Sequence, residues 1–210
     1  LFVGRGLTLQ TDPTPSGTAE LENRLLKSVR NDQLVVTSFA DVSAAAGIDQ
    51  DPSELDFTPS AAWADFDGDG DPDLAVARLI DRLPGGPGGD PQNGSHIYVN
   101  QGDGTFVESA GAVFNGAFWW NSSLVWTDFD GDADFDLVGT GQVTGYVGTR
   151  VFLQDAGELT YASEDIGLGR REALKDVRAM DVDLDGAMDL VSIPEASTVA
   201  PRLYLQDRDA

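Results

Sequence analysis

Short apolar segments recur along the chain, and acidic or glycine-containing turns separate them. One example is the run from Leu74 to Ala77, which follows an acidic turn directly, and another is the segment 97–99, which ends at the turn 101–104. Apolar runs of this length, bounded by turn residues, are typical of β-strands. The pattern predicts an all-β organisation from about residue 34 onward.

The segments form a repeating unit of strand, acidic loop, strand, connection, strand, tight turn and strand. The predicted strands are 60–64, 74–79, 96–100 and 105–108 in the first unit, 123–127, 137–140, 150–154 and 158–162 in the second, and 176–180, 190–193 and 202–206 in the third. The acidic loops begin 63 and 53 residues apart. A period near fifty with four strands favours a β-propeller blade. We therefore predict a propeller-like array of about three four-stranded blades, at about 59–108, 122–162 and 175–210, with 34–48 as the outer strand of a preceding or neighbouring blade.

The first 33 residues fit this pattern least well, and we treat 1–33 as an N-terminal arm. Residues 1–10 alternate like a strand, and the segment 12–17 has the composition of a turn or linker. Leucines and a valine at helical spacing within 20–30 predict a short amphipathic helix. An irregular arm is an equal alternative for that segment.

Three copies of the pattern D-x-D-x-D-G-x-x-D occupy the acidic loops. The expected side-chain ligands, at positions 1, 3, 5 and 9, are Asp65, Asp67, Asp69 and Asp73, then Asp128, Asp130, Asp132 and Asp136, then Asp181, Asp183, Asp185 and Asp189. Position 7 is expected to offer only a backbone carbonyl, from Asp71, Asp134 and Ala187. Position 6 is glycine, which permits a sharp turn, except in the second copy, where Ala133 predicts strain or weaker binding.

Carboxylates placed this close repel one another unless a cation lies between them. Calcium takes six to eight oxygen ligands at flexible geometry, so we predict about three Ca²⁺ ions, one in each loop. An EF-hand is excluded because its position 12 is glutamate, whereas position 12 here is Val76, Gly139 or Ser192. The alternative, three solvated acidic turns, is hard to reconcile with three copies in the same context.

The loop 65–74, together with the segment 97–106 that follows it, resembles the FG-GAP/VCBS family of β-propeller repeats. The segment 38–48 also resembles the outer strand and exit of a blade of this family. The likeness covers about residues 34–206. The family includes the heads of integrin alpha subunits and many secreted bacterial proteins. The resemblance implies calcium loops between the first and second strands of each blade.

Family propellers commonly close with seven blades, whereas this chain holds about three, and its third unit stops before a fourth strand. Three interpretations stay open: the chain is a fragment, it closes on itself, or neighbouring copies complete each other's sheets in a ring or filament. In the last interpretation the segment 1–10 could be the donor strand.

Composition restricts the partners and the compartment. Lys and Arg total 13 against 36 Asp and Glu, a formal charge of −23, which disfavours nucleic acid and anionic lipid as partners. The absence of cysteine excludes disulfides and thiolate chemistry. No segment approaches the roughly 18 apolar residues of a membrane span. The chain begins at Leu1, so we expect a processed or trimmed chain, secreted or at the cell surface, where calcium is abundant.

Other candidate sites are an aromatic cluster of Phe118, Trp119 and Trp120, which could bind sugar or a partner protein or could pack between blades, and two N-glycosylation sequons at Asn93 and Asn121. No nucleophile elbow, histidine dyad or phosphate loop is present, so we do not expect an enzyme. The function expected is an extracellular structural or adhesive calcium-binding module that presents a rigid surface or assembles with copies of itself. The alternative is a carbohydrate-binding module, either a lectin or an accessory domain of a lyase.

Overall fold

The computed structural model describes residues 10–13, 19–22, 24–48, 57–79, 96–109, 123–143, 146–162, 168, 173–196 and 198–207. These residues form strands and one four-residue helix. The elements are β1 (Gln10–Pro13), β2 (Ala19–Glu22), β3 (Leu26–Arg30), β4 (Val36–Asp41), α1 (Ser43–Ala46), β5 (Phe57–Ala64), β6 (Asp73–Leu79), β7 (His96–Asn100), β8 (Phe106–Glu108), β9 (Leu124–Thr127), β10 (Asp136–Val143), β11 (Tyr146–Asp155), β12 (Glu158–Tyr161), β13 (Leu174–Met180), β14 (Asp189–Pro194) and β15 (Arg202–Tyr204).

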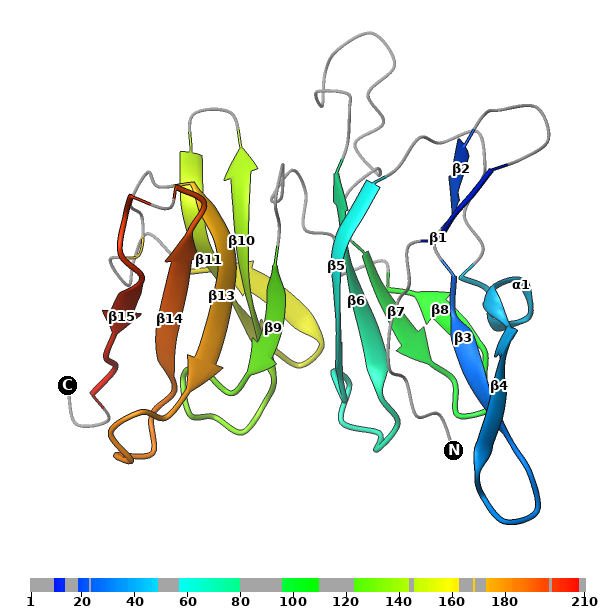
Figure 1. Cartoon of the computed structure of the whole chain (residues 1–210). Helices are drawn as coiled ribbons and strands as arrows, with labels where there is room; N and C mark the ends of the chain where they lie inside the picture. The colour runs from blue at the N-terminus through cyan, green and yellow to red at the C-terminus, as the bar shows by residue number, and fades with distance from the viewer. Residues whose placement is uncertain are drawn as a thin grey trace, which may run out of the picture.

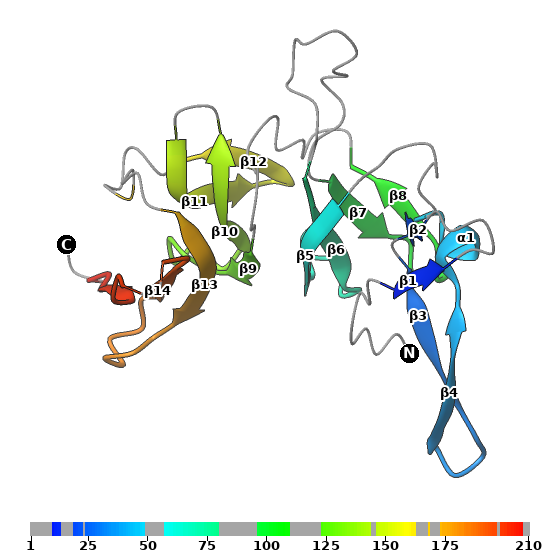
Figure 2. The same ribbon diagram turned by 45° about the horizontal axis from the view of Figure 1, so that its top comes forward.

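The strands pair only with their neighbours in sequence, and every pairing is antiparallel. Sheet I contains β5 to β8, sheet II contains β9 to β12, and sheet III contains β13 to β15, while β1–β2 and β3–β4 form two-stranded sheets. Figure 1 shows the β3–β4 hairpin and sheets I, II and III side by side in a row, and Figure 2 shows the same order from a second direction. The fold class predicted from the sequence is therefore confirmed at the level of an all-β chain of antiparallel sheets.

Sheet I is buried on both faces, which explains why its second strand is a continuous apolar run. Leu74 and Val76 pack in one cluster with Leu25 and Ile48 from the N-terminal side. Residues 75 and 77, whose side chains point the opposite way, join a second cluster with sheet II. A strand buried on both faces loses the alternation of apolar and polar residues that marks a half-exposed strand.

Sheet II repeats this arrangement one step further along the row. Leu137 faces sheet I, whereas its neighbour Val138 packs with Val177 and Leu190 of sheet III. Hydrogen bonds also cross the boundaries between sheets. The Leu124 N–H donates to the Ser60 hydroxyl at 3.1 Å, and the Ser123 hydroxyl donates to a carboxylate oxygen of Asp176 at 2.5 Å.

The N-terminal region differs from its prediction. The expected helix over 20–30 is wrong, because these residues contribute β2 and β3, and β3 pairs with β4 from Leu26–Asp41 onward. The outer strand expected within 34–48 is β4, and its hairpin partner β3 lies in the segment for which the sequence pattern suggested a helix or an irregular arm. The proposed donor strand at 1–10 lies almost wholly outside the described residues. Within the described part, no helix has the length and apolar character needed to cross a membrane.

Candidate metal centres

Each acidic loop joins the first strand of a sheet to the second, at β5–β6, β9–β10 and β13–β14. All three loops lie along the same side of the row of sheets, one loop under each sheet at the lower edge in Figure 1. In each loop the carboxylates at positions 1, 3 and 9 come together, with one oxygen from each residue within 4.8 Å of the others. The three groups are Asp65, Asp67 and Asp73; Asp128, Asp130 and Asp136; and Asp181, Asp183 and Asp189.

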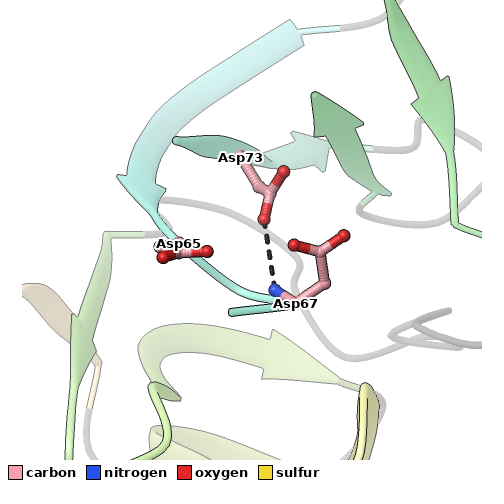
Figure 3. Close-up of side chains that lie close together, drawn as sticks. All are labelled: Asp65, Asp67 and Asp73. Atoms are coloured by element: carbon pink, nitrogen blue, oxygen red, sulfur yellow. Dashed lines mark hydrogen bonds between the residues drawn. The ribbon is translucent and has the colours of Figure 1, made fainter. Parts of the chain in front are cut away.

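The aspartate at position 9 fastens each loop to its own sheet. Asp73 is 0% exposed, and its Oδ2 accepts the Phe66 N–H at 2.7 Å and the Asp67 N–H at 3.3 Å. Figure 3 shows the second of these bonds, with the Asp65 side chain on the preceding part of the loop. The other oxygen, Oδ1, accepts the N–H of Asn100, at the end of the third strand, at 2.8 Å.

The same hydrogen bonds recur in the other two sheets. The oxygens of Asp136 accept the N–H groups of Phe129 at 2.6 Å and Gln154 at 2.8 Å. Those of Asp189 accept the N–H groups of Val182 at 2.8 Å and Gln206 at 2.9 Å. Position 9 thus holds the loop and the third strand together in all three copies.

Position 1 provides an observation that fits a bound cation. Asp65 Oδ2 accepts the Gly70 N–H and Asp181 Oδ2 accepts the Gly186 N–H, both at 3.0 Å. The other oxygen of each residue, Oδ1, is buried and has no hydrogen-bond partner in the described structure. A buried charged oxygen without a donor is costly, and coordination to a cation removes that cost.

Positions 5 and 7 do not belong to these groups of three. The carboxylates of Asp69, Asp132 and Asp185 each accept the backbone N–H of position 7, at 2.9, 2.9 and 2.8 Å. They therefore stabilise the turn of the loop. Their role as metal ligands, and that of the carbonyls of Asp71, Asp134 and Ala187, stays a prediction.

Two positions in each loop, 4 and 6, have left-handed backbone. The sequence had indicated a sharp turn only at position 6. Position 4 has φ of 74° at Gly68, 82° at Gly131 and 64° at Leu184. Position 6 has φ of 94°, 80° and 90° in the three loops, and the second value belongs to Ala133. Leu184 and Ala133 hold a conformation that L-residues adopt only at a cost of about 1–2 kcal/mol.

Residues 65–139 match the family model of the FG-GAP-like repeat. This stretch of the chain is similar to an FG-GAP-like repeat. It contains the first two acidic loops and ends just inside β10. The resemblance inferred from the sequence is confirmed for this stretch. No curated protein matches the chain. The third loop lies beyond the matched residues but has the same arrangement at positions 1, 3 and 9.

Burial raises the pKa of two carboxyl groups in the stretch 65–139. Asp73 and Asp136 are both 0% exposed, and loss of solvent raises the pKa of each above its usual value, although backbone N–H groups act in the opposite direction. The pKa of Asp130 is also raised, first by burial and then by the neighbouring carboxylates. In the first two loops, burial of these carboxyl groups therefore favours the protonated form, and a bound cation would displace the protons.

We expect the metal-free protein to lose stability as the pH rises above 3.8, the unfolded pKa of these carboxyl groups. A carboxyl group whose pKa is higher in the folded state stabilises the fold fully below its unfolded pKa of 3.8, and this contribution disappears as the pH passes the folded pKa. In saturating calcium we expect the opposite dependence, with stability rising as the pH rises, because the cation binds the ionised carboxylates. Urea unfolding across this range, with and without calcium, tests this. A metal-free midpoint that rises steadily with pH would contradict it.

Replacing Ala133 with glycine should stabilise the second loop by about 1 kcal/mol, because glycine adopts a φ of 80° without steric strain. The reverse change, Gly70→Ala, is the matched control. A methyl group at Gly70 would have no atom within 4 Å, so only backbone strain at φ 94° should destabilise that variant. Urea midpoints in calcium measure both changes, and equal midpoints for all three proteins would refute the argument.

The other candidate residues stand as follows. The aromatic cluster 118–120 and the sequons at Asn93 and Asn121 lie outside the described residues. Trp63 and Trp126 pack against the core, and the Trp126 indole donates to the Ala62 carbonyl at 3.2 Å. His96 is a buried strand residue whose Nδ1 contacts the Glu108 carboxylate.

Sequence reasoning missed the role of three residues, although each lies close to the end of the third strand of its sheet: Asn100, Gln154 and Gln206. Their shared place in the repeat was the available signal. The structure shows that all three donate a backbone N–H to the aspartate at position 9 of their own sheet.

Proposed function

We propose that this chain is an extracellular structural module whose sheets are propeller-like blades, each stabilised by one calcium ion. The observation that carries the proposal is the repetition of one arrangement: three carboxylates, within 4.8 Å of one another, at the same place in three adjacent sheets. Carboxylates are hard oxygen ligands, and calcium accepts the flexible geometry of such loops better than magnesium does. About three ions would bind.

The location outside the cell rests on charge and on calcium supply. Extracellular calcium modules bind at about 10⁻⁴–10⁻³ M, a concentration range that suits loops exposed to solvent at position 3. The formal charge of −23 favours solubility where divalent cations are plentiful. We propose a scaffolding or adhesive role without catalysis.

Edge strands support self-assembly as part of this function. Among the described residues β15 pairs only with β14, and β3 pairs only with β4, so each is an edge strand of its sheet. Free edges accept further strands from other chains. We propose that copies add strands to one another and form a ring or a filament.

Sedimentation velocity at several protein concentrations in millimolar calcium tests assembly. We expect species larger than 22.3 kDa whose share grows with concentration. A single 22.3 kDa species at every concentration would overturn the assembly step. A calorimetric titration that shows no calcium binding would overturn the metal-binding step.

A further inference from the structure

Two glutamines reach from one sheet to the acidic loop of the sheet before it. Gln154, in β11 of sheet II, donates from Nε2 to the carbonyl oxygen of Phe66 at 2.8 Å. Gln206, after β15 of sheet III, donates from Nε2 to the carbonyl oxygen of Phe129 at 2.9 Å. Phe66 and Phe129 are the second residues of loops 65–73 and 128–136. Each glutamine therefore joins its own sheet, by its backbone, to the neighbouring loop, by its side chain.

The amide oxygen of each glutamine has no hydrogen-bond partner in the described structure. Gln154 is 5% exposed, and its Oε1 is buried without a donor, as is Oε1 of Gln206. Leaving such an oxygen unsatisfied costs about 1–3 kcal/mol. A ligand that supplies a donor at this point would recover that free energy.

Both glutamines line a cleft that they share with the first two metal-binding positions of the preceding loop. Gln154 faces a cleft of about 380 Å³ together with Asp65 and Asp67. Gln206 faces a cleft of about 700 Å³ together with Asp128 and Asp130. These volumes hold several water molecules, and the carboxylates make the clefts polar.

We propose that each glutamine positions the preceding loop for its cation, because its Nε2 group donates to the carbonyl of the residue between the first two ligands of that loop. Groups that hold metal-binding residues in place tune metal affinity strongly. The inference rests on the proposed calcium binding and adds that a metal site is completed by the next sheet along the row.

Sheet I offers an internal comparison. Asn100 holds the place of Gln154, but the β3–β4 hairpin that precedes sheet I has no acidic loop. The Asn100 side chain stays within its own sheet, where Nδ2 donates to the Pro72 carbonyl at 3.1 Å and Oδ1 accepts the Gly102 N–H at 3.0 Å. The longer side chain therefore occurs in the two sheets that follow an acidic loop, and the shorter one where none precedes.

The test is a calcium titration of the whole chain followed by backbone amide NMR. Glycines report on each loop separately, at Gly68, Gly131 and Gly186. In Gln154→Met, which keeps the side-chain length but removes the amide, we expect half-saturation at Gly68 to need about 10–100-fold more calcium. Gln206→Met should produce the same shift at Gly131 alone.

Two further variants strengthen the test. Gln154→Asn keeps an amide but shortens the side chain to that of sheet I, and we expect the same weakening at Gly68. Gln101→Met is the control, because Gln101 is exposed and its side chain donates to the nearby Val99 carbonyl, away from the acidic loops. It should leave all three loops unchanged.

The loop in which calcium affinity falls distinguishes this inference from a packing defect. The Gln154 backbone N–H bonds to Asp136, so damage to packing would weaken the loop 128–136 of its own sheet. Weakening at Gly131 in place of Gly68, equal weakening in all loops, or no change at Gly68 would each overturn the inference. If no glycine in the unmodified chain responds to calcium, the proposed function itself fails.

Discussion

Removing calcium with a chelator is expected to lower the melting temperature by roughly 2–17 °C. A ligand that binds only the folded state at about 1–10 times its Kd contributes about 0.4–1.4 kcal/mol, so three such sites contribute about 1–4 kcal/mol. For a chain of this size each kcal/mol corresponds to about 2–4 °C. The physical reason is the repulsion among carboxylates that approach within 4.8 Å in each loop.

Differential scanning calorimetry in millimolar calcium and in EDTA measures this change. Magnesium is the control, because it demands octahedral geometry and dehydrates reluctantly, so it should restore much less of the stability. Far-UV circular dichroism should show that the strands persist in EDTA at low temperature. An unchanged melting temperature in EDTA would show that the loops fold without help from a cation.

Asp136→Ala is expected to destabilise the fold by about 3–5 kcal/mol, both with and without calcium. The side chain is fully buried and accepts the N–H groups of Phe129 and Gln154, which would lose their partner. Each unsatisfied buried donor costs about 1–3 kcal/mol, and the lost anchoring of the loop adds to this. Relief from burying a carboxylate offsets part of the cost.

The matched control is Asp134→Ala, an exposed aspartate two residues earlier in the same loop. We expect it to change the free energy of unfolding by less than about 0.5 kcal/mol in EDTA, since surface changes are usually small. Urea unfolding of both variants in calcium and in EDTA decides the matter. If Asp136→Ala loses stability in calcium alone, position 9 is a metal ligand without the structural role argued above.

The acidic loops and the strands beside them could be predicted because local sequence determines them. Carboxylates at alternate positions of a tight turn converge whatever surrounds them, and Leu74 to Ala77 is apolar enough to be a strand in most contexts. The same reasoning failed at 20–30, where leucine spacing suggested a helix. There β3 forms by pairing with β4, whose six residues are all exposed and show no alternation.

Other features of the site depend on contacts that no local pattern contains. The bond from Gln154 to Phe66 spans 88 residues, and that from Gln206 to Phe129 spans 77. The left-handed backbone at position 4 was hidden because Leu184 occupies it in the third loop. At Leu184 the loop imposes a backbone conformation that leucine does not favour by itself.

The burial of sheets I and II on both faces makes the molecule behave like a one-dimensional stack. In such a stack the stability of each unit is its own contribution plus the terms it shares with two neighbours. Sheet II has both terms within the described chain, whereas the strands of sheet III leave Met180 53% and Leu203 50% exposed. Unfolding should therefore begin at sheet III and advance toward the middle of the row, so the order in which sheets open is set by their place in the row.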